Sequence, residues 1–90
     1  MNVYVVTYTS YNERNKELSN KVMATHNRIN AIQLYDEFKS EAMNDAMGKD
    51  EEYDTVQVEK CISSIGNRKY HVERVDYECG FQATVELEKF

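Results

Sequence analysis

The chain has 90 residues, of which 41% are hydrophobic, and a net charge of −5. A chain of this length builds one hydrophobic core, and its apolar fraction is higher than that of disordered chains with high net charge, so we expect one folded domain over residues 1–90. The acidic balance argues against direct binding to nucleic acid, because that function requires clustered lysine and arginine.

Two strands are predicted before the first helix. Residues Val3–Tyr11 are β-branched and aromatic, and they alternate between two faces, so that Tyr4, Val6 and Tyr8 share one of them. Residues 12–16 are polar and rich in turn formers, and residues 18–25 return to an extended pattern. This order predicts a long hairpin.

One amphipathic helix of about 17 residues is predicted next. With Asn30 as the N-cap, Gln33 would complete a capping box and Ile29 and Leu34 a hydrophobic staple; alternatively, Asn27 caps a helix that begins one turn earlier. Gly48 stands where a C-cap is expected. The core-facing residues at helical spacing are Ile32, Tyr35, Phe38, Ala42 and Ala46, joined by Ala31, Leu34 and Met43.

The last third of the chain predicts three strands in a meander. The strands are expected at residues 55–64, at residues 68–78 and from Phe81 onward, with turns at Gly66-Asn67 and at Gly80. Alternation in the last strand buries one of its faces, formed by Phe81, Ala83, Val85 and Leu87. The predicted fold class is therefore α+β, with the order ββαβββ and the helix packed on an antiparallel sheet.

The residues suggest no catalytic or metal chemistry. Cys61, His71 and Cys79 lack the short ligand spacing of zinc sites, and we expect both cysteines to be free thiols. The glycines stand at turns, so neither a phosphate loop nor a dinucleotide fingerprint is present. We therefore expect no enzyme activity, no metal and no cofactor.

The acidic residues are concentrated in one stretch of the chain. Residues 36–54 hold eight acids and two bases, a net charge of −6, whereas the other 71 residues have a net charge of +1. Three of these acids, Glu37, Glu41 and Asp45, follow one another at i, i+4 and i+8, where like charges repel each other. The row rises roughly 6 Å per step, close to the spacing of phosphates along a nucleic-acid strand.

This row is the basis of the main functional hypothesis. We expect a non-enzymatic inhibitor or adaptor that imitates nucleic acid and docks into the basic groove of a nucleic-acid-handling protein, as a viral anti-nuclease or anti-CRISPR protein would. The alternative is that the acidic face only keeps the protein soluble. The candidate contact residues are Glu37, Glu41, Asp45, Asp50, Glu51 and Glu52.

Two other functions are weighed against this hypothesis. A structural protein would pair with a copy of itself through an exposed edge strand, the first or the last of the chain. A small RNA-binding domain would use Tyr4, Tyr8, Arg68 and Lys69, although core packing explains the tyrosines better. The first residues contain neither a signal peptide nor a membrane segment, so we expect a cytoplasmic location, in the host cytoplasm if the protein is viral.

Overall fold

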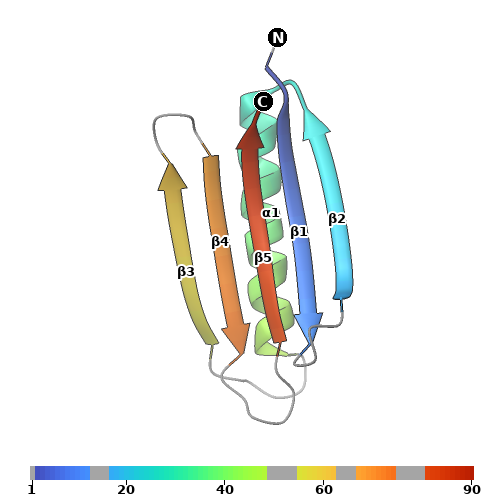
Figure 1. Cartoon of the computed structure of the whole chain (residues 1–90), viewed down its shortest axis with the longest axis vertical. Helices are drawn as coiled ribbons and strands as arrows, with labels where there is room; N and C mark the ends of the chain where they lie inside the picture. The colour runs from blue at the N-terminus through green and yellow to red at the C-terminus, as the bar shows by residue number, and fades with distance from the viewer. Residues whose placement is uncertain (1, 13–16, 49–54, 63–66, 75–80) are drawn as a thin grey trace.

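The computed structural model describes residues 2–12, 17–48, 55–62, 67–74 and 81–90. The predicted α+β class and the order ββαβββ are confirmed (Figure 1). The predicted loop at residues 49–54 and the glycines of the two predicted turns, Gly66 and Gly80, lie outside the described residues. The elements are β1 (Tyr4–Asn12), β2 (Glu17–Thr25), α1 (Arg28–Met47), β3 (Thr55–Ile62), β4 (Asn67–Arg74) and β5 (Phe81–Lys89).

The five strands form one sheet in the order β2-β1-β5-β4-β3, and every pair of neighbours is antiparallel. The first and last strands therefore lie side by side in the interior of the sheet, and Val3 and Phe90 exchange backbone hydrogen bonds of 3.2 and 2.7 Å. The prediction that β1 or β5 is an edge strand is wrong. One side of β1 is paired by the local hairpin with β2, and the last strand occupies the other side, so the edges are β2 and β3.

Helix α1 begins one turn earlier than the leading prediction. Asn27 is the N-cap, and its side chain accepts hydrogen bonds from the backbone N–H groups of Ile29 and Asn30 at 2.9 and 3.2 Å. The cap at Asn30 is therefore wrong, and the alternative at Asn27 is correct, because Asn27 supplies the acceptor for the first backbone N–H groups while Asn30 lies inside the helix. The helix ends at Gly48, which has a φ of 81° and donates its N–H to Asn44 O at 3.1 Å.

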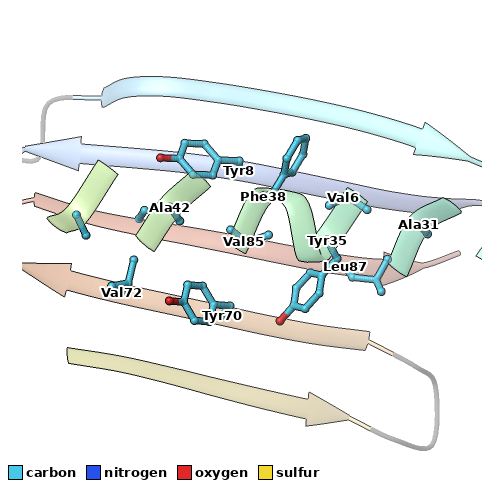
Figure 2. Close-up of a cluster of buried hydrophobic side chains, with 12 residues drawn as sticks. Val6, Tyr8, Ala31, Tyr35, Phe38, Ala42, Tyr70, Val72, Val85 and Leu87 are labelled. Atoms are coloured by element: carbon cyan, nitrogen blue, oxygen red, sulfur yellow. The ribbon is translucent and has the colours of Figure 1, made fainter. Parts of the chain in front are cut away.

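The hydrophobic core lies between α1 and one face of the sheet (Figure 2). Its helical residues, all of them predicted, are Ala31, Tyr35, Phe38, Ala42 and Ala46. The strands add Val6, Tyr8, Tyr70, Val72, Ala83, Val85 and Leu87. The three alanines let the helix approach the sheet closely, while Phe38 packs edge-on against the ring of Tyr8 at 6.3 Å between centroids.

The opposite face of the sheet is directed away from α1. In Figure 1 the helix lies behind β5 and is visible between β4 and β1, so the viewer looks onto this second face, which we call the open face. Side chains such as Thr7, Thr84 and His71, which alternate with the core residues, lie on it. Within the described ranges, no helix has both the length and the hydropathy that crossing a bilayer requires.

Candidate interaction surfaces

The predicted acidic row runs along the surface of α1, with Glu37 and Asp45 exposed and Glu41 half-buried, but two of its carboxylates have partners on the sheet. Each step of four residues along a helix turns by about 40°, so the row winds from the outer side of α1 toward the sheet. Glu37 is exposed, but Glu41 forms an ion pair with Lys21 of β2, and Asp45 accepts a hydrogen bond from Tyr8 of β1. Two of the three carboxylates therefore join the helix to the sheet. Asp50, Glu51 and Glu52 lie outside the described residues.

The bond between Tyr8 and Asp45 connects the core to the surface. The ring of Tyr8 is fully buried, and its hydroxyl donates to Asp45 Oδ2 at 2.7 Å. Burial, and then the hydrogen bond and the negative charge of Asp45, raise the pKa of this hydroxyl well above its ordinary value of 10.0. The neutral phenol is therefore the form that the fold favours.

A basic residue from a distant strand stabilises the end of α1. The last turn of the helix contains no basic residue, although its carbonyl groups attract cations. Arg74 of β4 fills this role, because its Nε donates to Ala46 O at 2.9 Å and its Nη2 to Asp45 O at 3.0 Å. The acidic row thus costs less local stability than the sequence suggests.

A solvent-open groove of about 300 Å³ lies between α1 and β3. The helix packs over β1, β5 and β4, and longer side chains reach toward β3. Lys39 donates to both oxygens of Glu59 at 3.0 and 3.1 Å, and it lies over the ring of Tyr70 at 5.6 Å. The residues that line the groove are Lys39, Ser40, Met43, Asn44, Gln57, Glu59 and Tyr70.

Two groups of this groove, Glu59 and Tyr70, have pKa values that are shifted away from neutral pH. Burial opposes ionisation of Glu59, but hydrogen bonds from Lys39 and Tyr35 outweigh it, so the pKa of Glu59 lies below its ordinary value of 4.5. Burial and the negative charge of Glu59 raise the pKa of Tyr70. General acid–base catalysis works best with groups that titrate near the working pH. Glu59 and Tyr70 are thus suited to holding a fixed hydrogen-bond pattern.

Strand β3 presents an apolar strip on the open face. Val56 and Val58 have 55% and 51% of their surface exposed, and they pair across the hairpin with Glu73 and His71. The sequence showed the alternation of these valines but not that their face is uncovered. The pairing of β3 with β4 could have revealed this exposure, because residues opposite each other share a face. Neither valine lies opposite the buried Tyr70 or Val72.

The residues of the RNA-binding alternative do not form a common surface. Tyr8 is fully buried, which excludes stacking on bases, and Tyr4 packs against the same core. Lys69 lies on the open face, where it forms an ion pair with Glu86 at 3.7 Å. The prediction that Tyr8 contacts RNA is wrong, because its ring is buried in the hydrophobic core.

Within the described part of the chain, no group of three or more His, Cys, Asp or Glu residues could hold a metal ion. Cys79 and the side chain of Cys61 lie outside what the structure describes.

Comparison with protein-family models, with curated proteins and with solved structures finds no match.

Proposed function

We propose that this chain is a non-enzymatic protein-binding module that accepts an extended segment of a protein beside β3. One observation carries the proposal: β3 forms an edge of the described sheet and exposes two valines at alternate positions. An edge strand presents unpaired backbone N–H and C=O groups, and an added strand satisfies them. The apolar strip supplies hydrophobic contact in addition to these hydrogen bonds.

The chemistry around β3 specifies the kind of segment. A strand laid against β3 would place alternate side chains on the open face, beside Val56 and Val58, and the others toward the groove beside Gln57 and Glu59. The first set should be apolar, and the second should be polar, because amide, carboxylate and ammonium groups line the groove. An alternation of apolar and polar residues is therefore the expected ligand pattern.

The other edge of the described sheet, β2, is less suited to binding an added strand. Among the described side chains of β2, the two exposed large apolar residues, Val22 and Met23, are consecutive and lie on opposite faces, so they do not form a strip on one face as Val56 and Val58 do. The β2 edge therefore serves as an internal control.

A displayed random-peptide library tests the proposal. We expect selected peptides to alternate apolar and polar residues, and binding should slow hydrogen exchange of the β3 backbone amides. The double variant Val56→Lys/Val58→Lys should lose binding, while Val22→Lys/Ala24→Lys on the opposite edge should retain it. Selected peptides that leave exchange at β3 unchanged would refute strand addition.

A second candidate function follows from the exposed part of the acidic helix. Asp36 has 61% of its side chain exposed, and the neighbouring Glu37 is also exposed. These two carboxylates support a reduced form of the docking hypothesis, in which the outer side of α1 enters a basic groove of a nucleic-acid-handling protein. Electrostatic docking of this kind weakens with added salt.

Displacement of a fluorescent DNA oligonucleotide from a panel of purified nucleases tests this second candidate. We expect salt-sensitive displacement that Asp36→Asn/Glu37→Gln abolishes. The variant Glu17→Gln/Glu88→Gln removes the same charge elsewhere and should behave like the wild type. Equal loss in both variants would mean that only the net charge matters, which contradicts a specific docking site.

A further inference from the structure

We infer that the strand which β3 accepts is β3 of a second copy of this chain, so that two sheets join about a two-fold axis at Gln57. This inference rests on the proposed function and names its partner. The reason is that β3 itself has the alternation of apolar and polar residues that we expect in a strand bound beside it. Val56 and Val58 lie on the open face, and Gln57 and Glu59 lie on the helix side.

The geometry of a two-fold axis determines which residues meet. An axis perpendicular to the sheet pairs the two β3 strands antiparallel and keeps both helices on the same side. Opposite residues then share a face, as they do within each sheet. Because α1 lies over β1, β5 and β4, the two helices would be separated by both β3 strands.

The valines favour the register centred on Gln57. In this register Val56 meets the partner's Val58, and Val58 meets the partner's Val56, which joins four exposed valines into one apolar cluster. Cross-strand pairs of β-branched residues stabilise antiparallel sheets. A register centred on Val58 would instead place each Val56 opposite a lysine, Lys60.

Charge complementarity supports the same register. On the helix side, Glu59 meets the partner's Thr55, and Thr55 is paired on its other side with Arg74 of β4. A carboxylate thereby lies opposite a hydroxyl, and Arg74, whose guanidinium binds the carbonyl groups at the end of α1, lies one strand further along the same face. Registers centred on Glu59 or on Lys60 would place like charges directly opposite each other, which is destabilising.

The first experiment measures the mass of the full chain by light scattering and sedimentation over a range of concentrations. We expect a reversible dimer, and Val56→Lys/Val58→Lys should weaken its association at least about tenfold. The matched variant Val22→Lys/Ala24→Lys should dimerise like the wild type. Circular dichroism of each variant confirms that a loss of dimer is not a loss of folding.

The second experiment tests the register. In a Cys61→Ser/Cys79→Ser background, Gln57→Cys should be joined to its partner by a short bis-maleimide, because the two residues face each other across the axis. Val22→Cys should not be joined, since nine strand spacings of about 4.8 Å would place the two copies roughly 40 Å apart. Equal crosslinking at both positions would overturn the register.

The outcomes separate this inference from the proposed function. A chain that remains monomeric yet binds extended peptides at β3 would overturn the second copy as partner and leave the module intact. A dimer that tolerates both lysine substitutions would also overturn it. If peptides, too, leave the β3 amides unprotected, the proposed function fails as well.

Discussion

Tyr8 is the residue at which packing and electrostatics meet. Its ring lies in the core against Phe38, while its hydroxyl reaches Asp45 at the margin between β1 and α1. Lys21 lies over the same ring at 5.7 Å and bonds to Glu41. These contacts explain why carboxylates that repel one another along the helix are tolerated in the folded protein.

Removing the Tyr8 hydroxyl should destabilise the fold. We expect Tyr8→Phe to lower the free energy of unfolding by about 1 kcal/mol, since the hydrogen bond to Asp45 is lost while the ring remains. Urea denaturation at pH 7 measures this difference. Tyr11→Phe, on the open face, should change stability by less, and equal effects would mean that the bond to Asp45 contributes nothing specific.

The same substitution should change how stability depends on alkaline pH. Because the folded-state pKa of Tyr8 is raised above 10.0, its stabilisation is complete below that pH and is lost as the pH rises further. Wild type should therefore lose stability above pH 10 faster than Tyr8→Phe. Since Tyr70 contributes equally to both proteins, the difference belongs to Tyr8. A wild-type advantage that grows above pH 10 would contradict the sign.

Among the elements, α1 shows how local and distant residues share the stabilisation of one helix. Its start is a local matter, because Asn27 caps backbone groups two and three residues along. Its end depends on Arg74, which lies 28 residues beyond Ala46 in the chain. Both candidate caps are visible in the sequence, and the capping-box pattern favoured Asn30, whereas the structure has Asn27 as the N-cap. Both signals are local patterns of the same kind, so spacing alone does not decide between them.

The helix start can be tested by two matched substitutions. Asn27→Ala should lower the free energy of unfolding by about 1 kcal/mol, because two N–H groups lose their acceptor. Asn30→Ala should be neutral or slightly stabilising, since alanine is the better helix former inside a helix. Thermal denaturation of both variants decides the matter, and the opposite ranking would place the cap at Asn30.

Across the whole molecule, the sheet order makes the two ends of the sequence the centre of the structure. β1 and β5 are neighbours, and together they contribute Val6, Tyr8, Ala83, Val85 and Leu87 to the buried core. The edge strands carry the most exposed valines. Stability should therefore depend on the central strands, and partner binding on an edge.

One type of substitution at a central and at an edge position tests this division. Val85→Ala should lower the free energy of unfolding by about 2 kcal/mol, because it leaves a cavity in a fully buried site. Val22→Ala, on β2, should change it by no more than about 0.5 kcal/mol. Chemical denaturation measures both, and comparable losses would contradict the central role of β5.

The sequence alone was sufficient to predict the elements and much of the core. Alternation in β1 and β5, the helical spacing from Ala31 to Ala46, and Gly48 at the helix end are local signals with a definite period. Tertiary structure decided the strand order, which of the two faces of β3 is left uncovered, and which groups pair with the acidic row. They depend on residues far apart in the chain, as Tyr8 and Asp45 are, and no local period encodes which distant groups will meet.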